Sequence, residues 1–147
     1  MHIKTELNQV MESVIATRIA LADAEVSRLY TRRAVTEAEA ALSVARVTLM
    51  SRSDAGSNDA QRRAYAERET TPEREHLERM EARALSAEAD VINAAAALRI
   101  AEDRRRYLET VIRVMVSDAA DLLSHVYNDS ARMSDNTPDY GPNNPPF

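Results

Sequence analysis

Cysteine and tryptophan are absent from this sequence of 147 residues, which has only two glycines and one phenylalanine. Without cysteine there is no disulfide framework, no thiolate nucleophile and no zinc–thiolate site. Two glycines leave little for phosphate-cradling loops, and an aromatic content of 4% leaves little for the core of a β-sheet. These shortages favour a helical protein over one with a β-sheet core.

Long hydrophobic runs and an excess of positive charge are also missing. No apolar run approaches the roughly 20 residues that cross a bilayer, and the residues from Met1 to Lys4 do not begin a signal peptide. The formal net charge of −5 argues against a protein that coats nucleic acid through bulk charge. We therefore expect a cytoplasmic protein that does not contact a membrane.

What the sequence does contain is alanine, arginine and glutamate in long stretches free of glycine and proline. Residues 3–50 predict one long helix, residues 51–70 a linker with a short helix over 59–69, and residues 72–127 a second long helix. Thr71 and Pro72 provide an N-cap and a first helical residue. Residues 128–147 are rich in Asp, Asn, Ser and Pro and predict a disordered tail after the helical domain of residues 1–127.

Both long segments carry a seven-residue repeat of apolar residues. The first repeat runs from Leu7 to Leu49, with Arg28 as its one charged member, and the second runs from Leu77 to Val126, with Arg105 as its only exception. Such a pattern forms the a and d positions of a coiled coil. The fold class is therefore all-α, a long antiparallel helical hairpin whose seam is rich in alanine. We interpret Arg28 and Arg105 as residues that fix the register.

The length of the linker favours a hairpin within one chain. Flanking charges suggest a register in which Arg18 faces Glu109 and Arg46 faces Glu81. In the same register Met11 faces Val116 as an apolar pair, but Glu39 faces Glu88 as a repulsive one. The charge support is mixed, and each exposed pair contributes only about 0.5 kcal/mol.

At the open end of the hairpin, apolar residues cover more than one face of each helix. A single seam cannot bury them, and monomers rarely expose apolar patches of more than several hundred square ångströms. We therefore expect a dimer or a higher oligomer. The candidate interface residues are Ile3, Leu7, Val10, Met11, Val14, Ile15, Tyr107, Val111, Val114, Met115 and Leu122.

Catalytic chemistry has no candidate in this sequence. The serines lack a strand–turn–helix setting and a His–acid pair, so we expect no enzyme. Glu73 and His76 have the spacing of half a di-iron carboxylate site, but the core positions around them are apolar. We interpret them as a capping acid and a surface histidine, and we expect no cofactor and no metal.

Arg99, Arg106 and Arg113 lie at steps of seven on one face of the second helix. Such a column could contact nucleic acid or nucleotide phosphates. Glu102 and Asp103 interleave with it, however, and no aromatic platform accompanies it. A solvated helix face with local ion pairs is the alternative.

The last residues, Pro145, Pro146 and Phe147, present an aromatic ring and a carboxylate together on a stiff backbone. This ending resembles the C-terminal tip of bacterial single-stranded-DNA-binding proteins, which docks onto replication, recombination and repair proteins. The resemblance implies that the tail binds a protein. Neutral Asn143 and Asn144 stand where that family has acids.

The body resembles small helical-hairpin proteins of phages that infect GC-rich bacteria. The match covers residues 5 to 120, with the segment from Ser57 to Arg63 between two long helices rich in Ala, Arg and Glu. The resemblance implies an accessory factor in the host cytoplasm that oligomerises and binds a host or phage protein of DNA metabolism or defence. A structural or assembly component of a virion, and an oligomer that binds phosphates through the arginine column, are the alternatives.

Overall fold

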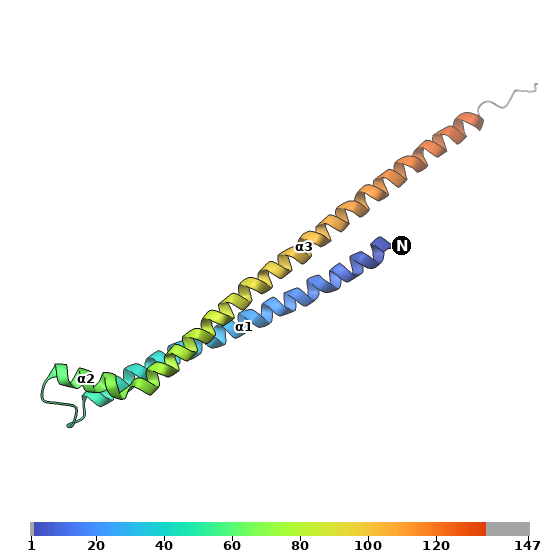
Figure 1. Cartoon of the computed structure of the whole chain (residues 1–147). Helices are drawn as coiled ribbons and strands as arrows, with labels where there is room; N and C mark the ends of the chain where they lie inside the picture. The colour runs from blue at the N-terminus through green and yellow to red at the C-terminus, as the bar shows by residue number, and fades with distance from the viewer. Residues whose placement is uncertain (1, 135–147) are drawn as a thin grey trace, which may run out of the picture.

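The computed structural model describes residues 2–134, and their side chains except at positions 131, 133 and 134. These residues form α1 (His2–Met50), α2 (Asp59–Glu69) and α3 (Thr71–Ser134). Helices α1 and α3 lie side by side and antiparallel, and α2 packs at the closed end of the hairpin (Figure 1). The predicted all-α helical hairpin with a short linking helix is confirmed.

The end of the second long helix was predicted wrongly. Helix α3 continues to Ser134, seven residues beyond the predicted end at residue 127. The Asp, Asn and Ser residues after Tyr127 are weak helix formers. Adding one residue to an existing helix is easy, however, and no proline occurs between Tyr127 and Pro138. The remainder of the predicted tail lies outside the described residues.

The closed end is built by side chains that cap α2. Asn58 is the N-cap, and its side chain accepts a hydrogen bond from the backbone N–H of Gln61 at 2.9 Å. The Gln61 side chain accepts in return from the backbone N–H of Ser57 at 3.0 Å. Gly56 has a φ of 130°, and a Cβ there would come within 2.5 Å of the Gln61 Cβ. The turn therefore requires glycine at this position.

Thr70 makes the bend between α2 and α3. It is fully buried, and its hydroxyl donates a hydrogen bond to the carbonyl oxygen of Ala66 at 2.8 Å. Its own carbonyl oxygen accepts from the backbone N–H of Arg74 at 3.1 Å, which is the first turn of α3. Thr70, rather than the predicted Thr71, is therefore the residue that precedes this helix.

The seam of the hairpin follows the predicted repeat. Every a and d position from Leu7 to Leu49 on α1 and from Leu77 to Ile112 on α3 is buried or half-buried, including Arg28 and Arg105. The long-helix residues that are most buried are Val10, Val14, Ala38, Leu42, Ala87, Ala101 and Leu108. Alanines among them let the two helices approach closely.

The register differs from the predicted one. Arg18 pairs with Glu102 at 2.8 Å, one heptad before the predicted Glu109. Arg46 pairs with Glu67 of α2 at 3.0 Å instead of with Glu81. The reason lies at the closed end, where α2 packs against the last turns of α1 and occupies the place that α3 would otherwise fill. Helix α3 is thereby displaced toward the N-terminus of α1.

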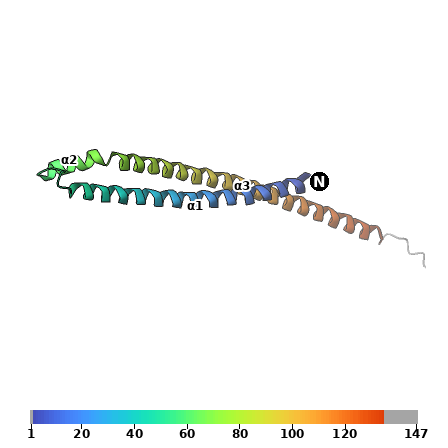
Figure 2. The same ribbon diagram turned by 90° about the horizontal axis from the view of Figure 1, so that it is seen from below.

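As a result, α3 runs well past the first turn of α1. Figures 1 and 2 both show its C-terminal part extending alone beyond the N-terminus, and every described side chain from position 113 to 130 is exposed. We call residues 113–134 the overhang. The hairpin therefore ends near Ile112, and the predicted pairing of Met11 with Val116 is wrong, since both side chains are exposed.

Candidate interaction surface

The overhang carries an apolar face that no part of the described chain covers. Its large apolar side chains are between 53% and 78% exposed, and they are Val114, Met115, Val116, Leu122, Leu123, Val126 and Tyr127. Most of them, with Ala119, occupy the a, d and adjoining e positions that continue the seam of the hairpin. On a helix these positions share one side. This side is the principal candidate surface of the molecule.

The residues predicted for an oligomer interface fall into three groups. Val10 and Val14 are 5% and 3% exposed because they form the core of the hairpin, so they offer nothing to a second chain. Ile3, Leu7 and Val111 are half-buried at the open end. The exposed members are Met11, Ile15, Tyr107, Val114, Met115 and Leu122.

A second apolar surface on the outside of α1 was not recognised in the sequence. Ile19, Val26, Leu29, Tyr30, Val44 and Val47 are all more than half exposed. They occupy the b, c and f positions of the heptads, opposite the seam, and this regular placement was the signal that could have revealed them. Nearby, Arg32, Val35, Glu81, Leu85 and neighbouring residues line a shallow groove of about 530 Å³ between α1 and α3.

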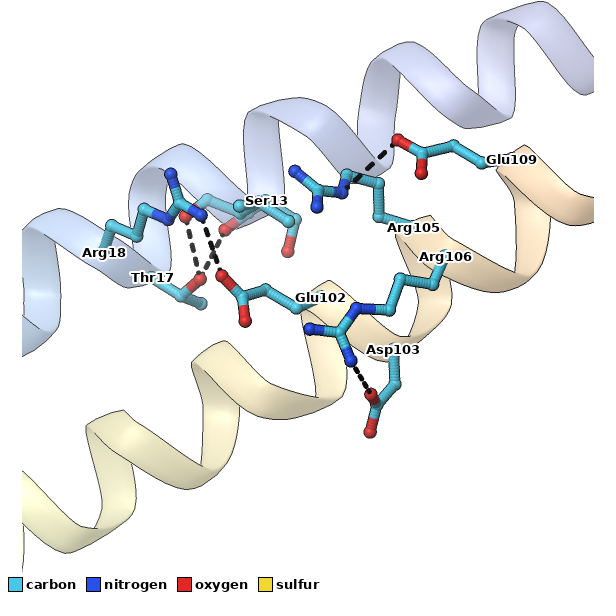
Figure 3. A network of polar contacts seen from close by, with 9 residues as sticks. Ser13, Thr17, Arg18, Glu102, Asp103, Arg105, Arg106 and Glu109 are labelled. Atoms are coloured by element: carbon cyan, nitrogen blue, oxygen red, sulfur yellow. Dashed lines mark hydrogen bonds and ion pairs between the residues drawn. The ribbon is translucent and has the colours of Figure 1, made fainter.

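Several polar side chains along the open half of the hairpin are paired with one another (Figure 3). Arg18 reaches Glu102 across the helices, and Arg104 reaches Glu6 at 2.9 Å. Within α3, Arg105 lies 3.4 Å from Glu109 and Arg106 lies 3.8 Å from Asp103. Positive and negative charges therefore alternate along this half of the hairpin and form no field of a single sign.

The ion pair between Arg18 and Glu102 changes the titration of the glutamate. The hydrogen bond from Arg18 holds the pKa of Glu102 below its ordinary value of 4.5, because it stabilises the charged carboxylate. A lowered pKa stabilises the folded chain at every pH above the ordinary value, and this contribution is lost as the pH falls through the lower, folded-state pKa.

We therefore expect the Glu102→Gln variant to be slightly less stable than the parent chain at pH 7 and equally stable in strong acid. Thermal unfolding followed by circular dichroism between pH 2 and pH 7 would measure the difference. Glu109→Gln is the matched control, since the partner of Glu109 lies on its own helix. A Glu102→Gln deficit that stays constant down to the lowest pH would contradict this account.

The arginine column is exposed on α3, as predicted. Within the described residues, Arg106 forms an ion pair with Asp103. The side chains of Arg99 and Arg113 are exposed to solvent. Glu102 and Asp103 interrupt the column, so its positive charge is diluted. Pro145, Pro146 and Phe147 lie outside the described residues.

Metal ligands and membrane spans are not found along residues 2–134. Nowhere in this range do three or more His, Asp or Glu side chains gather as metal ligands. None of the described helices is apolar over a stretch long enough to span a bilayer.

Comparisons with known proteins found no match to this chain. No protein-family model, no curated protein and no solved structure matches the chain. Function is therefore inferred from the chain's own surfaces.

Proposed function

We propose that this protein is a non-enzymatic interaction factor that assembles with itself through the overhang of α3. The observation that carries the proposal is the continuation of the coiled-coil repeat beyond the point where α1 ends. The same a and d positions that bury Leu108 in the hairpin expose Met115, Leu122 and Val126 on the overhang. A helix face of this composition is stable in water when another helix covers it.

The rest of the molecule supports a binding role over a catalytic one. The described part of the chain is a thin hairpin, and three ion pairs join its long helices along the seam. The exposed apolar residues of α1, from Ile19 to Val47, provide a separate surface on which a different protein can dock while the overhang is occupied. Two separate surfaces on one elongated chain would allow it to bring partners together.

Solution mass tests the proposal. We expect light scattering to give at least the mass of a dimer for the parent chain, and the mass of a monomer for Leu122→Glu. A charge in the contact leaves an unpaired buried carboxylate, and we expect the dissociation constant to rise about a hundredfold or more.

Ser117→Glu is the matched control, because position 117 lies on the opposite side of the same helix and carries the same added charge. It is expected to keep the parent mass. A parent chain that remains monomeric at all concentrations measured would refute self-assembly, and equal behaviour of the two variants would refute the role of this face.

A further inference from the structure

The side of α1 that faces away from α3 carries a second apolar stripe. Its members, which we call the outer stripe, are Ile15, Ile19, Ala22, Val26 and Leu29. We infer that two copies of this chain associate through the outer stripe, with their α1 helices parallel and in register. The inference goes beyond the proposed function, because it concerns a surface separate from the overhang and assigns that surface to a second copy instead of a different protein. The two hairpins point in the same direction, and both overhangs stay free.

The spacing of the outer stripe is that of a coiled-coil seam. Steps of four and three residues alternate from Ile15 to Leu29, so these side chains lie along one side of α1 over about 21 Å. The four large members are between 51% and 63% exposed, and Ala22 is exposed as well. An apolar stripe with this spacing is covered when it packs against another helix.

No part of the described chain blocks this side of α1. Helix α3 covers the hairpin seam on the opposite side, and α2 packs against the last turns of α1, beyond Leu29. A second α1 can therefore lie along the whole outer stripe, with its own α3 on the far side. Association orders no new helix, because the hairpin already holds α1 in its helical form.

The charges beside the outer stripe support the parallel direction. In a parallel pair, a residue at a g position faces the residue five positions later on the other helix. With the heptad counted along the outer stripe, Arg18 then faces Asp23 of the other copy, and Arg32 faces Glu37. Each pair occurs twice by symmetry, and all four join opposite charges. Charges at these positions set the direction in which two helices pair.

Arg18 and Arg32 can make these contacts without leaving their partners in the hairpin. Arg18 pairs with Glu102 and Arg32 with Glu88 of the same chain, yet the two arginine side chains remain 57% and 59% exposed. A guanidinium group has five N–H donors and can bind a second carboxylate. Each arginine then lies between a carboxylate of its own α3 and a carboxylate of the second α1.

The residue types of the outer stripe agree with a parallel pair. Ile19 and Val26 occupy its a positions, and Leu29 occupies a d position. β-Branched residues at a with leucine at d favour two parallel helices. The in-register pair is also closed by a twofold axis, so it stops at a dimer.

An antiparallel pair of the same stripes brings like charges together. With Ile19 against Leu29 of the other copy, the seam stays apolar. This register, however, sets Arg18 beside Arg32 and the two copies of Glu25 beside each other.

Shifting the antiparallel register by one heptad improves the charges but spoils the seam. In one direction the Arg33 guanidinium meets Ala22 inside the seam, and in the other the Glu12 carboxylate meets Leu29. Among these arrangements, the in-register parallel pair is the one in which the apolar layers and the flanking charges agree.

The Leu122→Glu chain isolates this contact from the overhang. The outer stripe has fewer large apolar side chains than the overhang, so we expect its contact to be the weaker one and to form at a higher protein concentration. Sedimentation of the Leu122→Glu chain is expected to show a monomer in dilute solution and a dimer as the concentration rises. Adding Val26→Glu is expected to keep this chain monomeric. Adding Ile100→Glu is the control, because Ile100 is exposed on α3, and it is expected to leave the dimer intact.

The outcomes separate the inference from the proposed function. A Leu122→Glu chain that stays monomeric at the highest concentration reached would overturn the inference and leave the outer stripe to a different protein. Equal association with and without Val26→Glu would also overturn it. If Leu122→Glu associates as strongly as the parent chain and Val26→Glu abolishes that association, the inference stands and the proposed function fails.

Single cysteines test the direction and the register, because the chain has no cysteine of its own. In the Leu122→Glu chain, Ile15→Cys and Leu29→Cys are each expected to give covalent dimers on their own with a short thiol crosslinker. A mixture of the two is expected to give few crosslinks between unlike chains, since the two positions lie about 21 Å apart along the pair. Preferential crosslinks between unlike chains, or none in a chain that dimerises, would overturn the parallel arrangement.

A charge reversal gives an independent readout. Asp23→Lys is expected to weaken association of the Leu122→Glu chain severalfold, because a lysine then faces Arg18 twice in the dimer. Asp90→Lys is the matched control, since it makes the same change of charge at an exposed position of α3. Sedimentation across a concentration series would measure both affinities. Equal weakening by the two variants would overturn the proposed pairing.

Discussion

Leu108→Ala is expected to lower the free energy of unfolding of the hairpin by about 2 to 5 kcal/mol, the range for deleting a buried leucine side chain. Leu108 is 5% exposed and is the last buried residue of α3 before the overhang. The hairpin has one thin seam, so few neighbouring side chains can move in to fill the cavity. Urea unfolding followed by circular dichroism at 222 nm would measure the loss.

Ile100→Ala is the matched control for this variant. Ile100 lies on the same helix, has the same number of carbon atoms and is 71% exposed. We expect it to change stability by less than about 0.5 kcal/mol, as surface substitutions usually do. If the two variants lost equal stability, the contact between α1 and α3 would not be the seam described above.

Amide hydrogen exchange in residues 113–130 is expected to depend strongly on protein concentration. A single helix of this length with no tertiary contacts is only marginally stable in water. In dilute solution the overhang should therefore open readily, and its amides should exchange with little protection. At concentrations where two copies associate, we expect protection to rise by about tenfold or more. Mass spectrometry of peptides from this region would follow the change.

Two controls keep this experiment specific. Peptides from residues 80–108 report on the hairpin, and their protection is expected to be the same at every concentration. In the Leu122→Glu variant, the overhang is expected to remain unprotected even at high concentration. Strong protection of the overhang in dilute solution would mean that it is stable without a second copy, and would remove the main physical reason for assembly.

The sequence by itself determined the helices and the faces that they bury. The absence of glycine and proline over residues 2–50 and 73–134 made α1 and α3 continuous, and the run around Gly56 made the break between them. The seven-residue repeat selected the residues of the seam, because apolar side chains at this spacing gather on one side of a helix. The end of α3 was missed, since composition alone gives weak information on where a helix without a stop signal ends.

The candidate surface was predictable in part. An excess of apolar residues at the open end was visible in the sequence, and Met115 and Leu122 are exposed as members of that surface. The sequence pattern could not show that Val10 and Val14 belong to the core of the hairpin and not to the exposed surface, because residues of the hairpin seam and of an oligomer interface follow the same repeat. Only the position of the opposing helix tells which of them is already covered.

That position was decided by the tertiary structure. Sliding one helix by seven residues leaves every a and d residue on the seam, so the repeat by itself favours no one of these registers over another. Exposed ion pairs contribute too little to choose among them. The choice is made where α2 folds back on α1, with the Glu67 carboxylate between Arg46 at 3.0 Å and Arg74 at 3.6 Å. By filling the closed end, α2 displaces α3 along α1, and this displacement turns the last apolar heptads of the seam into an exposed overhang.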